Sequence, residues 1–256
     1  MFSNIIEIII LSIVQGISEF LPISSSAHLN IVEIIFEFNS NSLMIDVSLH
    51  LGSLLAIVFY FRRELLDLRN NQKLLSLLII GSIPIVIAGY IISSTGLVNL
   101  LENNLKIIAW TTLIFGIILY LADKSKFDKK ISSNLNFKTI LYIGLFQILA
   151  LIPGVSRAGI TITAARLFRF NRFDSSKISF LLAIPAIAGA SVLQLKNAIG
   201  QNFEFNYLIL ISITLSFLFS YFTVKFFLDY INKFSLNIFV IYRIIISIIL
   251  FIIIYN

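Results

Sequence analysis

Long apolar stretches alternate with shorter polar ones along the chain. Six of them are long enough to cross about 30 Å of hydrocarbon, which takes about 20 helical residues. These stretches cover residues 43–61, 74–93, 105–122, 178–195, 207–227 and 236–255. The pattern predicts six full transmembrane helices.

Two further apolar regions, residues 5–37 and 137–169, are each interrupted near the middle by a polar break. The first break reads EFLPISSSAH and ends at His28, and the second reads PGVSRAGITIT and begins at Pro153. Broken backbone is tolerated at membrane depth only where it packs inside protein or lines a cavity. We therefore expect two re-entrant helix pairs, which makes the fold class an all-α polytopic membrane protein.

The basic residues indicate how the chain is oriented. Most of the 19 Lys and Arg residues lie in four stretches, residues 62–73, 124–138, 166–177 and 225–233. The tendency of basic loops to stay inside places all four in the cytoplasm. This assignment works only if each broken region returns to the side from which it entered. The net charge of +6 is then explained by topology, and nucleic-acid binding is not expected.

The four prolines fall into two matching pairs. LSIVQGISEFLPISS around Pro22 resembles IGLFQILALIPGVSR around Pro153, and IPIVIAG at Pro84 resembles IPAIAG at Pro185. Between the members of each pair come SLLAI and SFLLAI. These matches predict one domain, 1–256, built from repeats at about 1–122 and 137–256. Because the two breaks enter from opposite sides, the repeats are inverted, an arrangement that brings polar breaks together near the midplane.

The composition agrees with a membrane protein. The chain is 58% hydrophobic and 12% charged, with a mean hydropathy of +0.97, whereas soluble domains carry about 25% charged residues. It has no cysteine, which excludes disulfides, thiolate metal sites and cysteine nucleophiles. Two histidines, His28 and His50, are too few for a histidine-rich metal site. The apolar start without Lys or Arg does not favour a cleaved signal peptide.

The first break carries several groups capable of chemistry. Gln15 and Glu19 are four residues apart, so a helix places them on one face. Glu19 is suited to bind a hard divalent cation or to act as a base, and His28 to move protons near neutral pH. A serine beside such a base can become a nucleophile. The candidates are Ser24, Ser25 and Ser26.

The second break is suited to an anion. Its turn, PGVSRAG, can expose backbone N–H groups at the start of a short helix, and Arg157 adds a planar fork that matches phosphate. Its polar side chains also include Ser156, Thr161 and Thr163. Any single serine or threonine in a membrane helix is more often a packing residue. Glu, Ser and His at one break, opposite Arg at the other, favour a functional site that handles phosphate.

Three other polar residues lie in or near the apolar stretches. Asp46 and His50 are four residues apart near the outer end of a span, and we interpret them as structural. Arg243 lies inside the last span and needs a partner, which the sequence does not name.

The two breaks resemble motifs of the undecaprenyl-diphosphate phosphatase family, integral-membrane enzymes associated with bacitracin resistance. The first motif has the form Glu/Gln-x-x-x-Glu-Phe-Leu-Pro-x-Ser-Ser-Ser/Thr-Gly/Ala-His and is matched from Gln15 to His28. The second has the form Pro-Gly-x-Ser-Arg-Ser-Gly-x-Thr and is matched from Pro153 to Thr161, with Ala158 where the family usually has Ser. The resemblance covers nearly the whole chain.

The resemblance implies hydrolysis of a C55 polyprenyl diphosphate to the monophosphate and inorganic phosphate, which recycles the lipid carrier for peptidoglycan synthesis. It implies Mg²⁺ or Ca²⁺, with Glu19 and Gln15 at the metal. It also implies a multi-pass protein of the bacterial cytoplasmic (inner) membrane, with an active site open to the periplasmic face. The expected partners are the polyprenyl diphosphate and membrane lipid, with a homodimer as a further option and no nucleic acid.

Carried over by position, the resemblance implies a catalytic role for Glu19, Ser25, His28 and Arg157. The substrate-binding residues it implies are Ser24, Ser26, Gly154, Ser156, Arg157 and Thr161. The attacking group is either Ser25, with His28 as its proton partner, or a water activated by Glu19 or His28. A transporter or flippase of a polyprenyl phosphate or small anion is the alternative, because it also needs an inverted repeat and a midplane site. A nucleophile and a proton shuttle favour the enzyme.

Overall fold

The computed structural model describes residues 2–36, 43–95, 104–124, 129–199 and 207–255. Within these ranges the chain is helical and contains no β-strand. Lys126, which belongs to one predicted cytoplasmic loop, lies outside the described residues. The helices are α1 (Phe2–Ser18), α2 (Ser25–Phe36), α3 (Leu43–Tyr60), α4 (Arg62–Asp67), α5 (Gln72–Thr95), α7 (Leu105–Lys124), α8 (Ile131–Asn134), α9 (Phe137–Gln147), η1 (Ile148–Leu151), α10 (Arg157–Leu167), α11 (Arg172–Ile199), α12 (Tyr207–Ile231) and α13 (Asn237–Tyr255).

Six helices in the described part of the chain are long and apolar enough to cross a membrane, as the hydrophobic pattern predicted. They are α3, α5, α7, α11, α12 and α13. Pro84 and Pro185 lie inside α5 and α11, and both helices continue past them. A proline removes one backbone hydrogen bond, and neighbouring helices in a membrane bundle allow such a helix to persist.

The two interrupted regions each form a pair of packed helices. In the first, α1 is followed by residues 19–24 and by α2, which packs against α1. In the second, α9 and η1 are followed by residues 152–156 and by α10, which packs against α9. At 1.5 Å per residue, α2, α9 and α10, with 12, 11 and 11 residues, are too short to cross about 30 Å of hydrocarbon.

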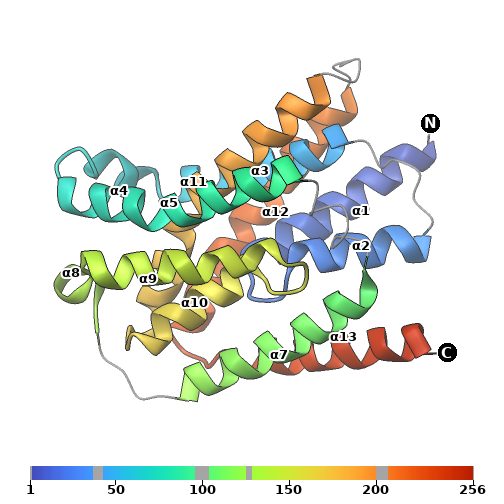
Figure 1. Cartoon of the computed structure of the whole chain (residues 1–256). Helices are drawn as coiled ribbons and strands as arrows, with labels where there is room; N and C mark the ends of the chain where they lie inside the picture. Colours follow the sequence, from blue (N-terminus) through green and yellow to red (C-terminus); the bar gives the residue numbers. More distant parts are fainter. Residues whose placement is uncertain (1, 37–42, 96–103, 125–128, 200–206, 256) are drawn as a thin grey trace.

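The helix pairs pack against the longer helices (Figure 1). α1 packs on α3 and α12, α9 packs on α5, and α10 packs on α7 and α11. The two halves meet where α3 contacts α11 and where α7 lies beside α13. A large apolar cluster includes residues of α3, α11 and α12 and extends to α5, α9 and α10. Within it, the Phe20 ring meets the Phe180 ring edge-on at 5.5 Å.

Small and hydroxyl-bearing residues bring α3 and α12 close together. Ser53 Oγ lies 3.1 Å from Ser216 Oγ and 2.9 Å from Ser220 Oγ, and Ser216 donates to the carbonyl of Leu49 at 2.6 Å. A Cβ at Gly52 would collide with the α12 backbone, so only glycine permits this approach. Membrane helices associate through such small-residue contacts and interhelical hydrogen bonds.

Candidate active site

A serine in a left-handed backbone conformation precedes the second helix of each pair. Ser24 has φ 76° before α2, and Ser156 has φ 72° before α10. The Ser24 carbonyl accepts the N–H of His28 at 3.4 Å, and the Ser156 carbonyl accepts the N–H of Ile160 at 2.9 Å. Positive φ is rare outside glycine and is found at sites where the surroundings hold the backbone in place. The two breaks therefore share a positive φ at the serine that precedes the second helix.

Glu19 is the centre of the polar contacts between the breaks. Its carboxylate is buried, and its Oε1 accepts a hydrogen bond from Nη2 of Arg157 at 3.2 Å. Its Oε2 accepts from Ser25 Oγ at 2.7 Å and from Gln15 Nε2 at 3.1 Å. Arg157 also reaches the Glu19 carbonyl at 3.4 Å. The structure thus brings Gln15, Glu19, Ser25 and Arg157 together, and the breaks face each other as the repeat argument expects.

Within the part of the chain that the structure describes, His28 makes two hydrogen bonds, and neither is to Ser25. Its Nδ1 lies 2.6 Å from the Ser24 carbonyl, and its Nε2 lies 2.7 Å from the hydroxyl of Tyr242 on α13. A carbonyl oxygen can only accept, so Nδ1 carries the hydrogen and Nε2 accepts from Tyr242 in the neutral ring. Within the described residues, the hydroxyl of Ser25 is bonded to Glu19 instead. The role of His28 as proton partner of Ser25 stays a prediction.

The remaining predicted substrate ligands differ in accessibility. Ser26 is exposed, and its Oγ lies 3.3 Å from Ser24 Oγ. Ser156 is buried, and its Oγ accepts the N–H of Gly159 at 3.1 Å, which caps α10. Thr161 is fully buried, and its hydroxyl donates to Arg157 O at 2.8 Å and lies 2.6 Å from Ser179 Oγ, from which it can accept. The side chain of Thr161 therefore joins α10 to α11.

Gly154 and Arg243 show how the second break is fixed. Gly154 has φ 86°, and its carbonyl accepts from Arg243 Nη2 at 2.9 Å and from Thr112 Oγ1 at 3.3 Å. Arg243 is 1% exposed and also donates to the carbonyls of Val155 at 3.0 Å and Pro22 at 3.2 Å. These carbonyls are the partners that the sequence did not name, and they tie α13 to both breaks.

Sequence reasoning also missed two residues beside the site. His50 of α3, interpreted as structural, places its Nδ1 2.6 Å from Gln15 Nε2 and 3.9 Å from Glu19 Oε2. Tyr242 of α13 contacts His28. A signal was present in each case: His50 is one of only two histidines, and Tyr242 precedes an arginine that lies inside an apolar span.

The oxygen atoms of Glu19 and Gln15 fit a hard cation that takes most of its ligands from water and substrate. Among the described residues, Gln15 Oε1 is buried and has no hydrogen-bond partner, and it lies next to a carboxylate that offers two oxygens. The described residues contain no group of three acidic or histidine side chains that could hold a metal by themselves. Mg²⁺ is commonly held by one or two carboxylates together with waters and substrate phosphates, and these residues match that mode.

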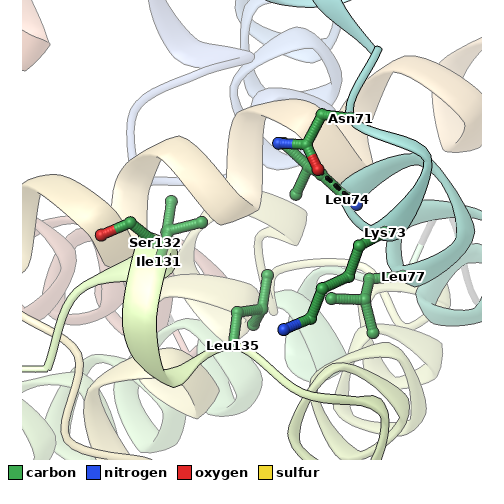
Figure 2. A pocket seen from close by; sticks show the side chains of 7 residues that line it. All are labelled: Asn71, Lys73, Leu74, Leu77, Ile131, Ser132 and Leu135. Carbon is green, nitrogen blue, oxygen red and sulfur yellow. Dashed lines mark hydrogen bonds between the residues drawn. The ribbon is translucent and has the colours of Figure 1, made fainter. Parts of the chain in front are cut away.

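One cavity in the described structure lies away from these residues. It has a volume of about 70 Å³ and opens between the first turns of α5 and helix α8. Figure 2 shows Asn71, Lys73 and Leu77 on one wall facing Ile131 and Leu135 on the other. None of the residues that line it belongs to the candidate active site.

Comparison with known proteins places the chain in a family. The sequence model described as bacitracin resistance protein BacA matches residues 8–249. The chain belongs to this family. It is 98% identical to an undecaprenyl-diphosphatase of Pelagibacter ubique (strain HTCC1062) over 256 residues, which is 100% of both chains.

More distant members of the family match over almost the same length. An undecaprenyl-diphosphatase of Elusimicrobium minutum is 39% identical over 256 residues, covering 96% of this chain and 97% of the relative. One of Prochlorococcus marinus (strain MIT 9215) is 35% identical over 260 residues, with the same coverage. Both breaks lie within the matched region of the family.

Proposed function

We propose that this chain hydrolyses undecaprenyl diphosphate to undecaprenyl phosphate and inorganic phosphate. The observation that carries the proposal is the contact of Glu19 with both Ser25 and Arg157, at 2.7 and 3.2 Å, in a family whose members are named undecaprenyl-diphosphatases. This set combines a base, a hydroxyl and a phosphate-binding cation. The reaction returns the lipid carrier to peptidoglycan synthesis. A transporter is not favoured, because the relatives of this chain carry the name of a phosphatase.

Arg157 is the proposed diphosphate clamp. Its guanidinium is largely buried, and its Nε has no hydrogen-bond partner within the described residues. A buried donor without a partner is costly, and a phosphate oxygen would satisfy it. The planar fork can also bind two phosphate oxygens at once, which fixes the orientation of the group that is transferred.

Ser25 and Glu19 are the proposed reacting pair. The Ser25 hydroxyl attacks the terminal phosphorus, its proton passes to Glu19 Oε2 at 2.7 Å, and the P–O bond to undecaprenyl phosphate breaks. Water then hydrolyses the phosphoserine and releases inorganic phosphate. In the variant reaction, water attacks directly, with Glu19 or His28 as its base. In both, positioning and electrostatic stabilisation supply most of the rate.

The proposed cation site consists of Glu19 and the Gln15 carbonyl oxygen. A divalent cation bound there supplies charge neutralisation for the oxygens of the diphosphate. The chain's own contribution is to keep the Glu19 carboxylate beside the amide of Gln15, whose oxygen has no hydrogen-bond partner among the described residues.

We further propose that the fold is an inverted repeat of residues 1–122 and 137–256 with two re-entrant helix pairs. Three observations support it. α1 packs on α12 as α9 packs on α5, and α3 packs on α12 as α11 packs on α5. α3 meets its counterpart α11, and α7 meets its counterpart α13, as helices beside a pseudo-twofold axis do. Ser24 and Ser156 have similar positive φ values, 76° and 72°, each directly before the second helix of its pair.

The distribution of basic residues supports an orientation with the basic loops in the cytoplasm. The family resemblance supports a location in the bacterial cytoplasmic membrane, with the site open to the periplasmic face. The proposed partners are the lipid diphosphate and the surrounding lipid. A homodimer stays an option that light scattering of the detergent-purified protein would decide.

Purified protein tests the proposed function directly. It should release phosphate from undecaprenyl diphosphate in the presence of Mg²⁺ or Ca²⁺ and lose this activity when a chelator is added. Release that continues unchanged in excess chelator would remove the cation from the proposal. If protein that a thermal melting curve shows to be folded releases no phosphate under either condition, the proposed function is overturned.

A further inference from the structure

The amide of Gln15 lies between two side chains in the interior of the protein. Its Nε2 is 3.1 Å from Glu19 Oε2 and 2.6 Å from Nδ1 of His50, and Gln15 is fully buried. Its carbonyl oxygen, Oε1, has no hydrogen-bond partner within the described residues. Both hydrogens of the amide are therefore used, while its acceptor is free.

The carboxylate of Glu19 decides which way this amide is turned. A carboxylate only accepts hydrogen bonds, so the nitrogen and not the oxygen of the amide must face it. The opposite rotamer would place two acceptors about as close as the 3.1 Å that the nitrogen now occupies. The second amide hydrogen then points at His50 Nδ1, which must offer a lone pair. This requires a neutral His50 ring with its hydrogen on Nε2.

We propose that His50 is a positioning residue of the candidate active site. It accepts the second hydrogen of the Gln15 amide, and the resulting chain His50–Gln15–Glu19 fixes the carboxylate and leaves Gln15 Oε1 free for an electropositive ligand. This inference rests on the proposed function for its effect on turnover, whereas the hydrogen-bond chain itself stands on geometry alone. Partners of this kind, one shell outside the reacting groups, orient them and tune their binding.

The hydrogen bonds at His28 and His50 require these two histidines to be opposite tautomers. His28 donates from Nδ1 to the carbonyl of Ser24 at 2.6 Å, so its neutral ring carries hydrogen on Nδ1. His50 accepts at Nδ1 from Gln15, so its ring carries hydrogen on Nε2. The chain has only two histidines, so each tautomer can be read without interference from others.

Nitrogen NMR of protein labelled with ¹⁵N-histidine tests the His50–Gln15–Glu19 hydrogen-bond chain independently of catalysis. Spectra are recorded in lipid nanodiscs at pH about 8.5, where an ordinary imidazole is neutral. The His28→Gln variant assigns the remaining signals to His50. We expect a protonated Nδ1 for His28 and a protonated Nε2 for His50, and we expect Gln15→Leu to shift only the His50 signals. A protonated Nδ1 on His50, or His50 signals unchanged in Gln15→Leu, would overturn the proposal.

Kinetics of two substitutions separate positioning from packing. Asn at position 50 places its Oδ1 close to where Nδ1 now lies, whereas Leu fills the space without an acceptor. His50→Leu should lower kcat by about 10-fold or more, and His50→Asn should stay within about 3-fold of the wild type, with KM changed little in both. Equal losses in both variants, together with equal falls in melting temperature, would show a packing role and overturn the proposal. If the wild type releases no phosphate, the proposed function fails while the NMR result still decides the tautomer of His50.

Discussion

The guanidinium of Arg157 lies 3.2 Å from the carboxylate of Glu19, and this buried ion pair joins the break of one helix pair to the break of the other. The two residues are 138 positions apart in the chain. Neither break forms the site alone, because the first supplies the carboxylate and the hydroxyl, and the second supplies the cation. Any change that separates the two helix pairs should therefore affect activity before it affects the helices themselves.

The clamp assignment predicts that Arg157→Lys loses most activity although the charge is kept. A lysine ammonium cannot make two parallel hydrogen bonds to phosphate oxygens. We expect phosphate release to fall by about 100-fold or more, as for loss of a donor that stabilises developing charge. The melting temperature of the variant serves as its control. Turnover close to that of the wild type would show that the fork geometry is not used.

The choice of nucleophile predicts different effects for neighbouring serines. Ser25 donates to Glu19, whereas Ser26 is exposed and contacts Ser24. Ser25→Ala should abolish phosphate release while diphosphate binding persists, and the matched Ser26→Ala variant should lose less than about 10-fold. Both rates are measured on the same substrate. Substantial turnover by Ser25→Ala, with little by His28→Gln, would instead support direct attack by water.

Arg243 should matter for folding of the breaks. Replacing it by Leu removes the donor of the buried Pro22 and Val155 carbonyls and one of the two donors of the Gly154 carbonyl. Hydrogen bonds from a charged group contribute about 1.5–3 kcal/mol each, so the free energy of unfolding should fall by at least about 3 kcal/mol. Thermal melting compares the stability of Arg243→Leu with that of Arg62→Leu, a control in which an exposed arginine is replaced. Equal melting temperatures in the two variants would contradict the structural role of Arg243.

The proposed orientation predicts the side from which single cysteines react. Cysteines at Asn70 and Lys129, both exposed, should react with impermeant thiol reagents only from the cytoplasm, and one at Lys106 only from outside. The chain has no native cysteine to obscure the result. Asn202, another outer position in the predicted topology, lies outside the described residues. Reaction of Asn70→Cys and Lys106→Cys from the same side would overturn the topology.

The sequence predicted most of the helices because hydrophobic length is a local property. It also distinguished prolines at helix ends from prolines inside helices. Polar residues follow Pro22 and Pro153, where the helices end, whereas apolar residues surround Pro84 and Pro185, where the helices continue. The motifs predicted that Glu19, Ser25 and Arg157 share a site, and the structure brings these three side chains together.

The contacts of His50, Tyr242 and Arg243 could not be predicted in the same way. Each depends on which helices pack together and how they are rotated, and a single sequence does not specify either. His50 reaches Gln15 across 35 residues, and Tyr242 reaches His28 across 214. An isolated histidine or arginine in an apolar helix indicates only that some partner must exist.

Phosphate release by Glu19→Gln, compared with Glu33→Gln, tests the central claim most directly. Glu19 contacts Gln15, Ser25 and Arg157, whereas Glu33 lies on α2 outside the site, so the same chemical change is made at two nearby positions. With undecaprenyl diphosphate and Mg²⁺, Glu19→Gln should lose about 100-fold or more in rate, because it removes both the base and the charge. Glu33→Gln should match the wild type. A Glu19→Gln variant that releases phosphate as fast as Glu33→Gln would contradict a catalytic site where the two breaks meet.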